Sequence, residues 1–485
     1  MTRKGTADRA AQKGRRLVMG QGSARDHQAG PDACDLLVRK GYVITMDAKR
    51  QVFPDGSVAV SDGRIVAVGP DREVGARFRG RRVIEANGAP VHPGFFDCHA
   101  HLSFHLTRGA FPDIAHAEYD RLYKNWQNTI TPEEEHASAL LACLEMLHNG
   151  ITYFLEPGTV WETDAAVKAA ERIGIRGSVA EPFLWDIDTQ TSQDVPRSPI
   201  DTKRAQRLLG KELWRNKEKD TLVRGHVGLF GAGTSSDELL LAAKACADGA
   251  QVILTQHQSF GVPVNEDTRL GKHPLVHYAE IGALGRNVTF SHMNVIRDDE
   301  VGPVRDSGMA LAWAPANYMN WGVATEFRSR APEMFRLGVP VNIGADVAKV
   351  WGFGDQGLIA YLLARDGGLY LSPENVLEMQ TVCGARAVGL EHELGSLEVG
   401  KRADLVVRRD DLPEARPPFD VVRNLALVSR SKAVRTVVVN GRVVLKDGVP
   451  MQVEDAEVYE IARKAGSRIT RRLGVHPGTS WPTVK

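Results

Sequence analysis

Eight short apolar segments, separated by connections, most constrain how this chain of 485 residues can fold. The segments are Gly94–His101, Ile151–Pro157, Arg176–Pro182, Arg224–Phe230, Gln251–His257, Asn287–His292, Ala310–Pro315 and Val341–Asp346. The connection from Thr131 to Gly150 has a helix-capping pattern followed by an apolar face. Strands that alternate with helices in this way predict an α/β fold, a (β/α)8 barrel of the TIM type.

Segments rich in strand-forming residues flank this region on both sides. "VAVSDGRIVAVG" near the start and "AVRTVVVNGRVVLKDG" near the end are each typical of a hairpin with a glycine-containing turn. We therefore predict a small β-sandwich formed from both chain ends, residues 34–92 and 394–450, beside a barrel of residues 93–393. Residues 1–33 are predicted to be a basic disordered tail, and residues 451–485 a C-terminal helix and tail.

The composition excludes several classes of partner. A formal net charge of +1 gives no electrostatic basis for binding nucleic acid or an anionic membrane. No apolar run reaches the roughly 18 residues that a membrane span requires. The five cysteines are scattered without a CxxC pair, which favours free thiols and a cytoplasmic protein over disulfides or a thiolate zinc site.

The ends of the predicted strands carry a group of imidazoles and one carboxylate. His99 and His101 end the first strand, His257 the fifth, His292 the sixth and Asp346 the eighth. Functional groups of such barrels collect at the carboxyl ends of the strands. A lone histidine there is usually structural, but the joint pattern suits a divalent metal such as zinc with one position open to water. Such a metal lowers the pKa of water to about 7.

The chain resembles the amidohydrolase superfamily, in its branch of triazine hydrolases and cytosine- or guanine-type deaminases. The resemblance rests on "PGFFDCHAH", "LTQH", "FSHMNVI", "WAPAN" and "NIGAD", and on the flanks "SDGRIVAVG" and "GSLEVGKRADLVV". It implies one divalent metal per chain, zinc before cobalt, iron or manganese, held by His99, His101, His257 and Asp346. It also implies a homo-oligomer, and a catalytic role for His292 together with Asp346.

Two departures from that branch bear on the substrate. The branch usually has H-x-x-E on strand 5, where the glutamate protonates the ring; here Phe260 takes that place and cannot carry a proton. "LFGAGTSS" replaces the usual histidine-proline element of strand 4. In character the chain is most similar to molinate and phenylurea hydrolases. Our leading prediction is therefore hydrolysis of the carbonyl C–N bond, or an ester or thioester bond, of a small hydrophobic amide, urea or carbamate.

Two alternatives remain open. The first is a deaminase or dechlorinase of an N-heterocycle, in which another acid replaces the missing glutamate. The second is a non-catalytic binding protein on the same fold. Candidate acids, or carboxylates that support the histidines, are Asp97, Glu156 and Glu181. Residues predicted to contact the substrate, most of them aromatic and suited to an apolar ligand, are Trp185, Phe230, Phe260, Trp313, Asn317, Trp321 and Trp351.

Overall fold

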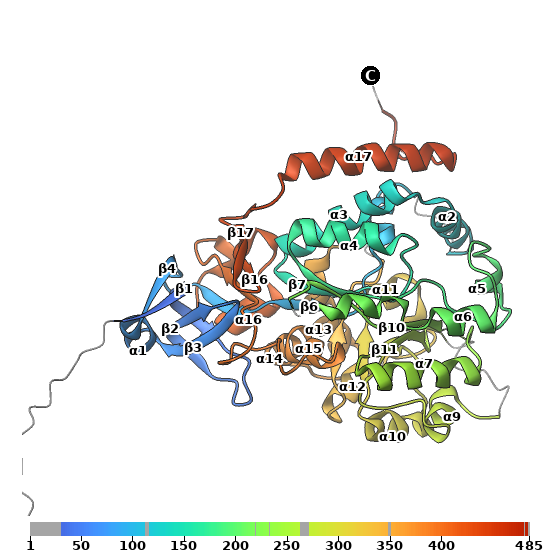
Figure 1. Cartoon of the computed structure of the whole chain (residues 1–485), viewed down its shortest axis with the longest axis horizontal. Coiled ribbons are helices and arrows are strands. Elements are labelled where there is room, and N and C mark those ends of the chain that lie inside the picture. Colours follow the sequence, from blue (N-terminus) through green and yellow to red (C-terminus); the bar gives the residue numbers. More distant parts are fainter. Residues whose placement is uncertain are drawn as a thin grey trace, which may run out of the picture.

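A helix-ringed barrel lies beside a strand-rich unit in the computed structural model (Figure 1). The structure describes residues 31–111, 116–218, 220–231, 233–261, 271–347, 351–479 and 481–483. The strands of the barrel are β6 (Phe95–Asp97), β7 (Ile151–Leu155), β8 (Arg176–Val179), β9 (Val223–Gly225), β10 (Val227–Gly231), β11 (Leu254–Gln258), β12 (Val288–His292), β13 (Ala310–Trp313) and β14 (Val341–Ile343).

The barrel strands run parallel in two sheets, β6 to β9 and β10 to β14. The predicted fourth strand is interrupted at His226, and this break passes the chain from one sheet to the other. The His226 amide donates to the Val179 carbonyl of β8 at 3.0 Å, whereas the Val227 amide donates to the Ile253 carbonyl at 3.2 Å. One predicted strand therefore serves both sheets as β9 and β10.

The two sheets close into a barrel between the first and last strands. A parallel bridge joins Ala100 to Asp346, and the Asp346 amide donates to the His99 carbonyl at 2.6 Å. The regular strand β6 is shorter than the predicted segment 94–101. Beyond Asp97 the described chain continues with the bridge to Asp346 and a hydrogen bond from the Ala100 amide to the Leu155 carbonyl at 3.0 Å, which do not extend the regular ladder. Closure of the barrel therefore brings His99 and His101, which follow the first strand, next to Asp346, which follows the last.

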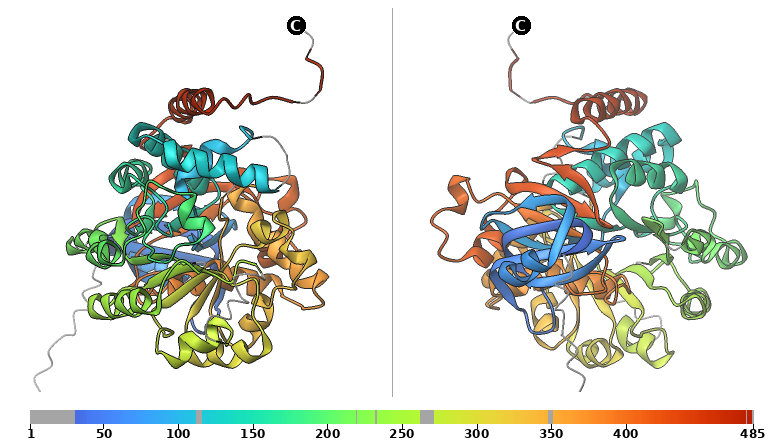
Figure 2. Two further views of the ribbon diagram at one scale, coloured as in Figure 1. Left: turned by 90° about the vertical axis from the view of Figure 1, so that its right-hand side faces the viewer. Right: turned by 60° about the vertical axis from the view of Figure 1, so that its left-hand side comes forward.

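Helices surround the barrel (Figure 2). Helix α3 (Pro132–His148) has the predicted capping box, in which Thr131 accepts from the Glu134 amide and Glu134 returns a bond to the Thr131 amide. The other helices from α2 to α15 are α2 (His116–Thr129), α4 (Thr163–Ile173), α5 (Gln190–Gln193), α6 (Thr202–Leu208), α7 (Asp237–Ala250), α9 (Pro274–Glu280), α10 (Asp298–Ser307), α11 (Pro315–Asn320), α12 (Ala331–Arg336), α13 (Gln356–Asp366), α14 (Pro373–Gln380) and α15 (Val382–Ala387).

Strands from both chain ends form one nine-stranded sheet (Figure 2). Its strands are β1 (Asp32–Ile44), β2 (Val52–Ser61), β3 (Arg64–Pro70), β4 (Phe78–Glu85), β5 (Pro90–Pro93), β15 (Leu405–Arg408), β16 (Val434–Val439), β17 (Arg442–Lys446) and β18 (Val449–Pro450). Strand β5 joins the two halves, since it pairs with both β1 and β15. Leu36 and Val60 share a core with Leu405 and Val438, so neither half buries its apolar face alone.

The terminal segments differ slightly from the predicted limits. Strand β1 begins at Asp32, inside the segment 1–33 that we expected to be a tail, because Asp32 and Ala33 pair in parallel with β4. Residues 1–30 lie outside the described residues. Near the other end, α16 (Val421–Leu427) precedes β16, and α17 (Asp455–Arg472) lies over α3 (Figure 1). Among the described residues, no helix combines the length and apolar character needed to span a membrane.

Candidate metal centre

Four histidines and one aspartate from four barrel strands meet at the closure of the barrel. His101 Nε2 lies 3.1 Å from Asp346 Oδ1, and His99 Nε2 lies 3.7 Å from the same oxygen. His292 Nδ1 is 3.9 Å from Asp346 Oδ2, and His257 Nε2 is 3.3 Å from His101 Nε2. All five residues are at most 8% exposed. The structure thus brings together every strand-end residue that the sequence pattern singled out.

Unusual backbone conformations aim two of these side chains. His292 has φ 69° and Asp346 has φ 59°, in the left-handed region that non-glycine residues rarely adopt. Asp97 fixes the neighbouring backbone, because its carboxylate accepts from the His99 amide at 3.1 Å and from the Ala345 amide at 3.0 Å. Burial raises the pKa of Asp97 to about 7. Asp97 therefore braces the first and eighth strands from below the site.

Hydrogen bonds orient two of the imidazoles. His257 Nδ1 donates to the Phe230 carbonyl at 2.7 Å, because a carbonyl can only accept. His101 Nδ1 lies 2.7 Å from Thr159 Oγ1, whose own proton goes to Glu156 at 2.5 Å, so this imidazole donates as well. Both rings then present an unprotonated Nε2 towards the centre of the cluster.

The donor set fits a divalent metal. The Nε2 atoms of His101 and His257 face one another at 3.3 Å although neither carries a proton for the other, an arrangement that a cation between them would relieve. Within the part of the chain that the structure describes, both nitrogens of buried His99 and Nδ1 of His292 have no hydrogen-bond partner. Nitrogen and carboxylate oxygen are the ligand types that zinc takes in catalytic sites. Burial lowers the pKa of His257 to about 3, which keeps this ring neutral and able to coordinate.

Thr159, which sequence reasoning missed, yields a testable expectation. Replacement of Thr159 by valine removes the acceptor for His101 Nδ1 while keeping the shape of the side chain. We expect about 10- to 100-fold weaker zinc binding, measured by competition with a chromogenic chelator. Thr159→Ser retains the hydroxyl and is expected to bind zinc almost as the parent does. Equal affinity of the valine and serine variants would show that Thr159 does not orient the ring.

The three candidate carboxylates have structural partners. Glu156 accepts from the amides of Gly158 and Thr159 and from the Thr159 hydroxyl, and burial raises its pKa. Glu181 forms an ion pair with Lys211 at 3.2 Å. Asp97 and Glu156 thus accept hydrogen bonds from backbone amides, Glu156 also from a hydroxyl, and Glu181 pairs with a lysine. We therefore do not assign the missing acid to any of the three.

The predicted aromatic residues divide by exposure. Phe230, Phe260 and Trp321 are partly exposed. Their rings gather at the histidines, with Phe230 centred 4.9 Å from His257, Phe260 4.8 Å from His292, and Trp321 6.2 Å from Phe260. These three remain our proposed substrate contacts.

Two of the predicted aromatic contacts have almost no surface to offer a substrate. Trp185 and Trp313 are 0% and 1% exposed, and Trp185 donates to the Ser198 carbonyl. Large side chains also fill the space between barrel and helices, so the aromatic pattern did not separate packing residues from lining residues. Trp351, 8% exposed, donates to the Ala345 carbonyl beside Asp346, and Asn317 is 3% exposed.

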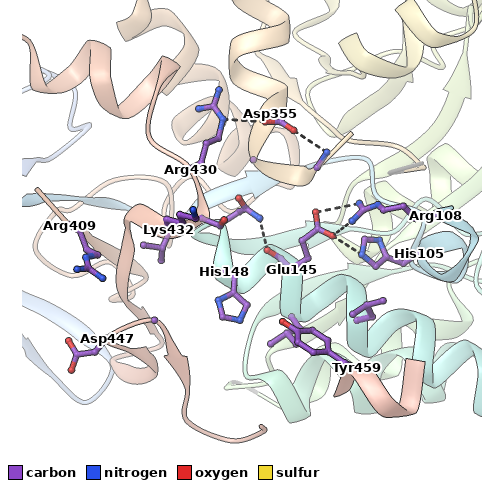
Figure 3. Close-up of a pocket in the computed structure, with 18 residues that line it drawn as sticks. His105, Arg108, Glu145, His148, Asp355, Arg409, Arg430, Lys432, Asp447 and Tyr459 are labelled. Atoms are coloured by element: carbon purple, nitrogen blue, oxygen red, sulfur yellow. Dashed lines mark hydrogen bonds and ion pairs between the residues drawn. The ribbon is translucent and has the colours of Figure 1, made fainter. Parts of the chain in front are cut away.

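A half-buried carboxylate network supports the site from α3 (Figure 3). Glu145 accepts from His105 at 2.8 Å, from Arg108 at 2.6 Å and from the Phe353 amide at 3.2 Å. Arg108 also donates to the Trp351 carbonyl at 3.1 Å. His105 follows His101 closely in the chain, and Trp351 follows Asp346. Glu145 thus ties together the segments after the first and eighth strands, a link between distant residues that gives no local sequence signal.

Substitution of Glu145 by glutamine should destabilise the fold. Burial raises the pKa of Glu145, but the His105 and Arg108 partners outweigh it and lower that pKa to about 2. Loss of the charge is expected to reduce the free energy of unfolding by about 1–3 kcal/mol at pH 7, measured by urea denaturation. The pKa of Glu145 is lower in the folded than in the unfolded protein. The difference in free energy of unfolding between the parent and Glu145→Gln should therefore become smaller as pH falls below about 4. A difference independent of pH would contradict the assignment.

Known proteins similar in sequence cover nearly the whole chain. It is 28% identical to 5'-deoxyadenosine deaminase of Methanosarcina mazei over 90% of this chain and 99% of that protein. It is 30% identical to 5-methylthioadenosine/S-adenosylhomocysteine deaminase of Syntrophobacter fumaroxidans over 90% of this chain and 98% of that protein.

Solved structures share the fold. An adenosine deaminase from Xanthomonas campestris with bound zinc aligns with a TM-score of 0.80 and 24% identity, over 91% of this chain and 100% of that one. Atrazine chlorohydrolase from Arthrobacter aurescens, complexed with zinc, aligns with a TM-score of 0.76 and 24% identity, over 89% and 100%. The sequence model of the amidohydrolase family matches residues 91–444. The chain therefore belongs to the amidohydrolase family, as a metal-dependent hydrolase that acts on carbon–nitrogen bonds.

Proposed function

We propose that this enzyme hydrolytically removes an amino group from a nitrogen heterocycle, with nucleoside-like compounds as its substrate class. The observation that carries the proposal is the near end-to-end similarity to relatives named as deaminases of 5'-deoxyadenosine, 5-methylthioadenosine and S-adenosylhomocysteine. This replaces amide or urea hydrolysis, the leading prediction from sequence, with what was its alternative. Phe260 and the strand-4 run "LFGAGTSS" had weighed against ring deamination, and we give similarity over about 90% of the chain more weight than these two local departures.

The residues present would hold one divalent ion, with zinc the best match to their chemistry. His99, His101, His257 and Asp346 supply three imidazole nitrogens and a carboxylate. When bound, such an ion lowers the pKa of water and stabilises negative charge that develops on the substrate. The buried surroundings strengthen these electrostatic effects, because little solvent screens them.

The chain's own groups would handle the protons of the reaction. Water oxygen bonds to the ring carbon, the bond from that carbon to the amino nitrogen breaks, and ammonia leaves an oxo-substituted ring. Of the two protons of the water, one ends on the ammonia and the other on the ring nitrogen next to the new oxo group. His292 lies between Asp346 and Phe260, and its Nδ1 makes no hydrogen bond to any residue that the structure describes. We assign His292 and Asp346 to accept the proton from water and to return it to the departing nitrogen. Phe260 and Trp321 would cover the flat face of the heterocycle.

Hydrolysis of an amide, urea or carbamate is the second candidate, and one observation favours it. The Phe260 ring meets His292 edge-on, with an interplanar angle of 83°, at the position where a ring-protonating acid is expected. Attack at a carbonyl does not require protonation of a ring nitrogen. A hydrophobic acyl substrate would therefore be compatible with Phe260.

An ammonia-release assay separates the two candidates. The zinc-loaded protein is incubated with 5'-deoxyadenosine and methylthioadenosine in one series, and with aryl amides and phenylureas in another. The proposal predicts ammonia from the first series and no organic amine from the second. Organic amine from the second series alone would establish the other candidate, and no product from either would refute both.

A further inference from the structure

The side chain of Arg408, at the end of β15, is a buried cation without an acidic partner. It is 2% exposed, and among the residues that the structure describes it forms no ion pair with a carboxylate. Its Nε donates to His92 Nε2 at 2.9 Å, and His92 is a neutral acceptor because its Nδ1 donates to the Pro93 carbonyl. A buried charge is costly unless an opposite charge compensates it.

The neighbours of Arg408 add positive charge instead of cancelling it. Burial, and then the nearby Arg430, lower the pKa of Arg408 to about 9, so the guanidinium remains charged at neutral pH. The nearby carboxylates pair with other arginines: Asp355 forms an ion pair with Arg430 (Figure 3), and Asp411 forms one with Arg409. Other bonds of Arg408 are a contact of 3.4 Å to the Asn149 carbonyl and a cation–π contact with Phe95.

Arg408 lines a cavity of about 310 Å³ between β5, β15 and α16. The Ser429 hydroxyl, on the same lining, is buried and finds no hydrogen-bond partner among the described residues. Of the lining carboxylates, Asp410 is paired with Arg416, and Glu414 is not a partner of Arg408. Apolar parts of the lining come from Tyr42, Pro90, Ala415, Pro418, Val421, Leu425 and Ala433.

We propose that this cavity binds a small organic anion, whose carboxylate or phosphate group contacts Arg408 and Ser429 while its apolar body lies against Val421 and Leu425. An anionic group would compensate the buried guanidinium, and charge-assisted bonds to arginine are among the stronger polar contacts in proteins. Phe95 and Asn149, which contact Arg408, lie at the amino ends of β6 and β7. The metal candidates lie at the carboxyl ends, so this site is separate from the catalytic one.

Binding of 4-fluorobenzoate to the zinc-loaded protein, followed by ¹⁹F NMR, tests the proposal directly. We expect saturable binding that becomes about tenfold weaker or more in Arg408→Met. Ser429→Ala leaves the guanidinium in place and should weaken binding of 4-fluorobenzoate several-fold. This second variant keeps the proposal testable if Arg408→Met fails to fold. His257→Ala should bind as the parent does, which distinguishes this site from the metal centre and from the proposed activity.

Inorganic phosphate as competitor identifies the preferred anionic group. Displacement of 4-fluorobenzoate by phosphate supports a site for either oxyanion, and failure of displacement supports a carboxylate ligand. Binding of phosphate alone, followed by ³¹P NMR and lost in Arg408→Met, supports a phosphate ligand. The proposal is overturned if neither probe binds the parent protein, or if folded Arg408→Met and Ser429→Ala bind both probes unchanged.

Discussion

Replacement of His257 by alanine is expected to lower kcat/KM by roughly a thousandfold or more, because several kcal/mol of transition-state stabilisation depend on the metal that this residue helps to hold. His257 Nε2 faces His101 Nε2, and the Phe230 carbonyl fixes its tautomer. Without this imidazole, the other proposed ligands, His99, His101 and Asp346, are too few to complete the coordination of the metal. Zinc content per chain, measured by plasma mass spectrometry after gel filtration, should fall together with activity.

His277→Ala provides the matched control for this substitution. His277 lies on α9, is half-buried and pairs with Asp237 at 2.8 Å, and it does not belong to the groups of described residues that could hold a metal. Its alanine variant should retain both zinc and turnover. Retention of full zinc content and activity by His257→Ala would show that the ligand assignment is wrong.

Replacement of Phe260 by glutamate should raise heterocycle deamination by roughly a hundredfold, the scale of a well-placed general acid or base. The Phe260 ring lies 4.8 Å from His292, so a carboxyl at this position can reach a substrate held between them. The carboxyl of Phe260→Glu could then donate a proton to the heterocycle and so assist departure of ammonia. Steady-state kcat/KM for the best deamination substrate is the quantity to compare.

Phe260→Gln has nearly the same size as the glutamate variant but cannot exchange a proton. It should therefore show no gain, and hydrolysis of amides should not improve in either variant. An equal gain in the glutamine and glutamate variants would attribute the effect to space or polarity. No gain above a measurable baseline in Phe260→Glu would mean that proton transfer at this position does not limit the reaction.

The barrel and the candidate metal residues followed from sequence because their signals are local and periodic. The histidines and Asp346 each end an apolar strand, and a barrel brings strand ends to one face. The family resemblance rested on the same strand-end motifs. The split of the fourth strand at His226 was not predictable, since neighbouring strands on either side determine where a ladder changes partner.

Supporting residues escaped prediction because their partners are distant in sequence. Thr159 hydrogen-bonds to His101, and Glu145 accepts from the Phe353 amide. Both contacts join residues that are far apart in the sequence and come together only in the folded chain. Arg408 is unremarkable in "VVRRDD" and acquires its character only from burial beside His92. The proposed reaction differs from the leading sequence prediction for another reason. Two local departures, Phe260 and "LFGAGTSS", decided the sequence interpretation, whereas the proposal rests on similarity over about 90% of the chain.

Product analysis in ¹⁸O-labelled water tests the central claim most directly. The zinc-loaded protein is incubated with 5'-deoxyadenosine, and the product is examined by mass spectrometry. The account predicts that the amino group is replaced by one oxygen carrying the label, with ammonia released in equal amount and both lost in His257→Ala. An unchanged nucleoside, while a phenylurea under the same conditions yields labelled acid or carbonate and free amine, would contradict it.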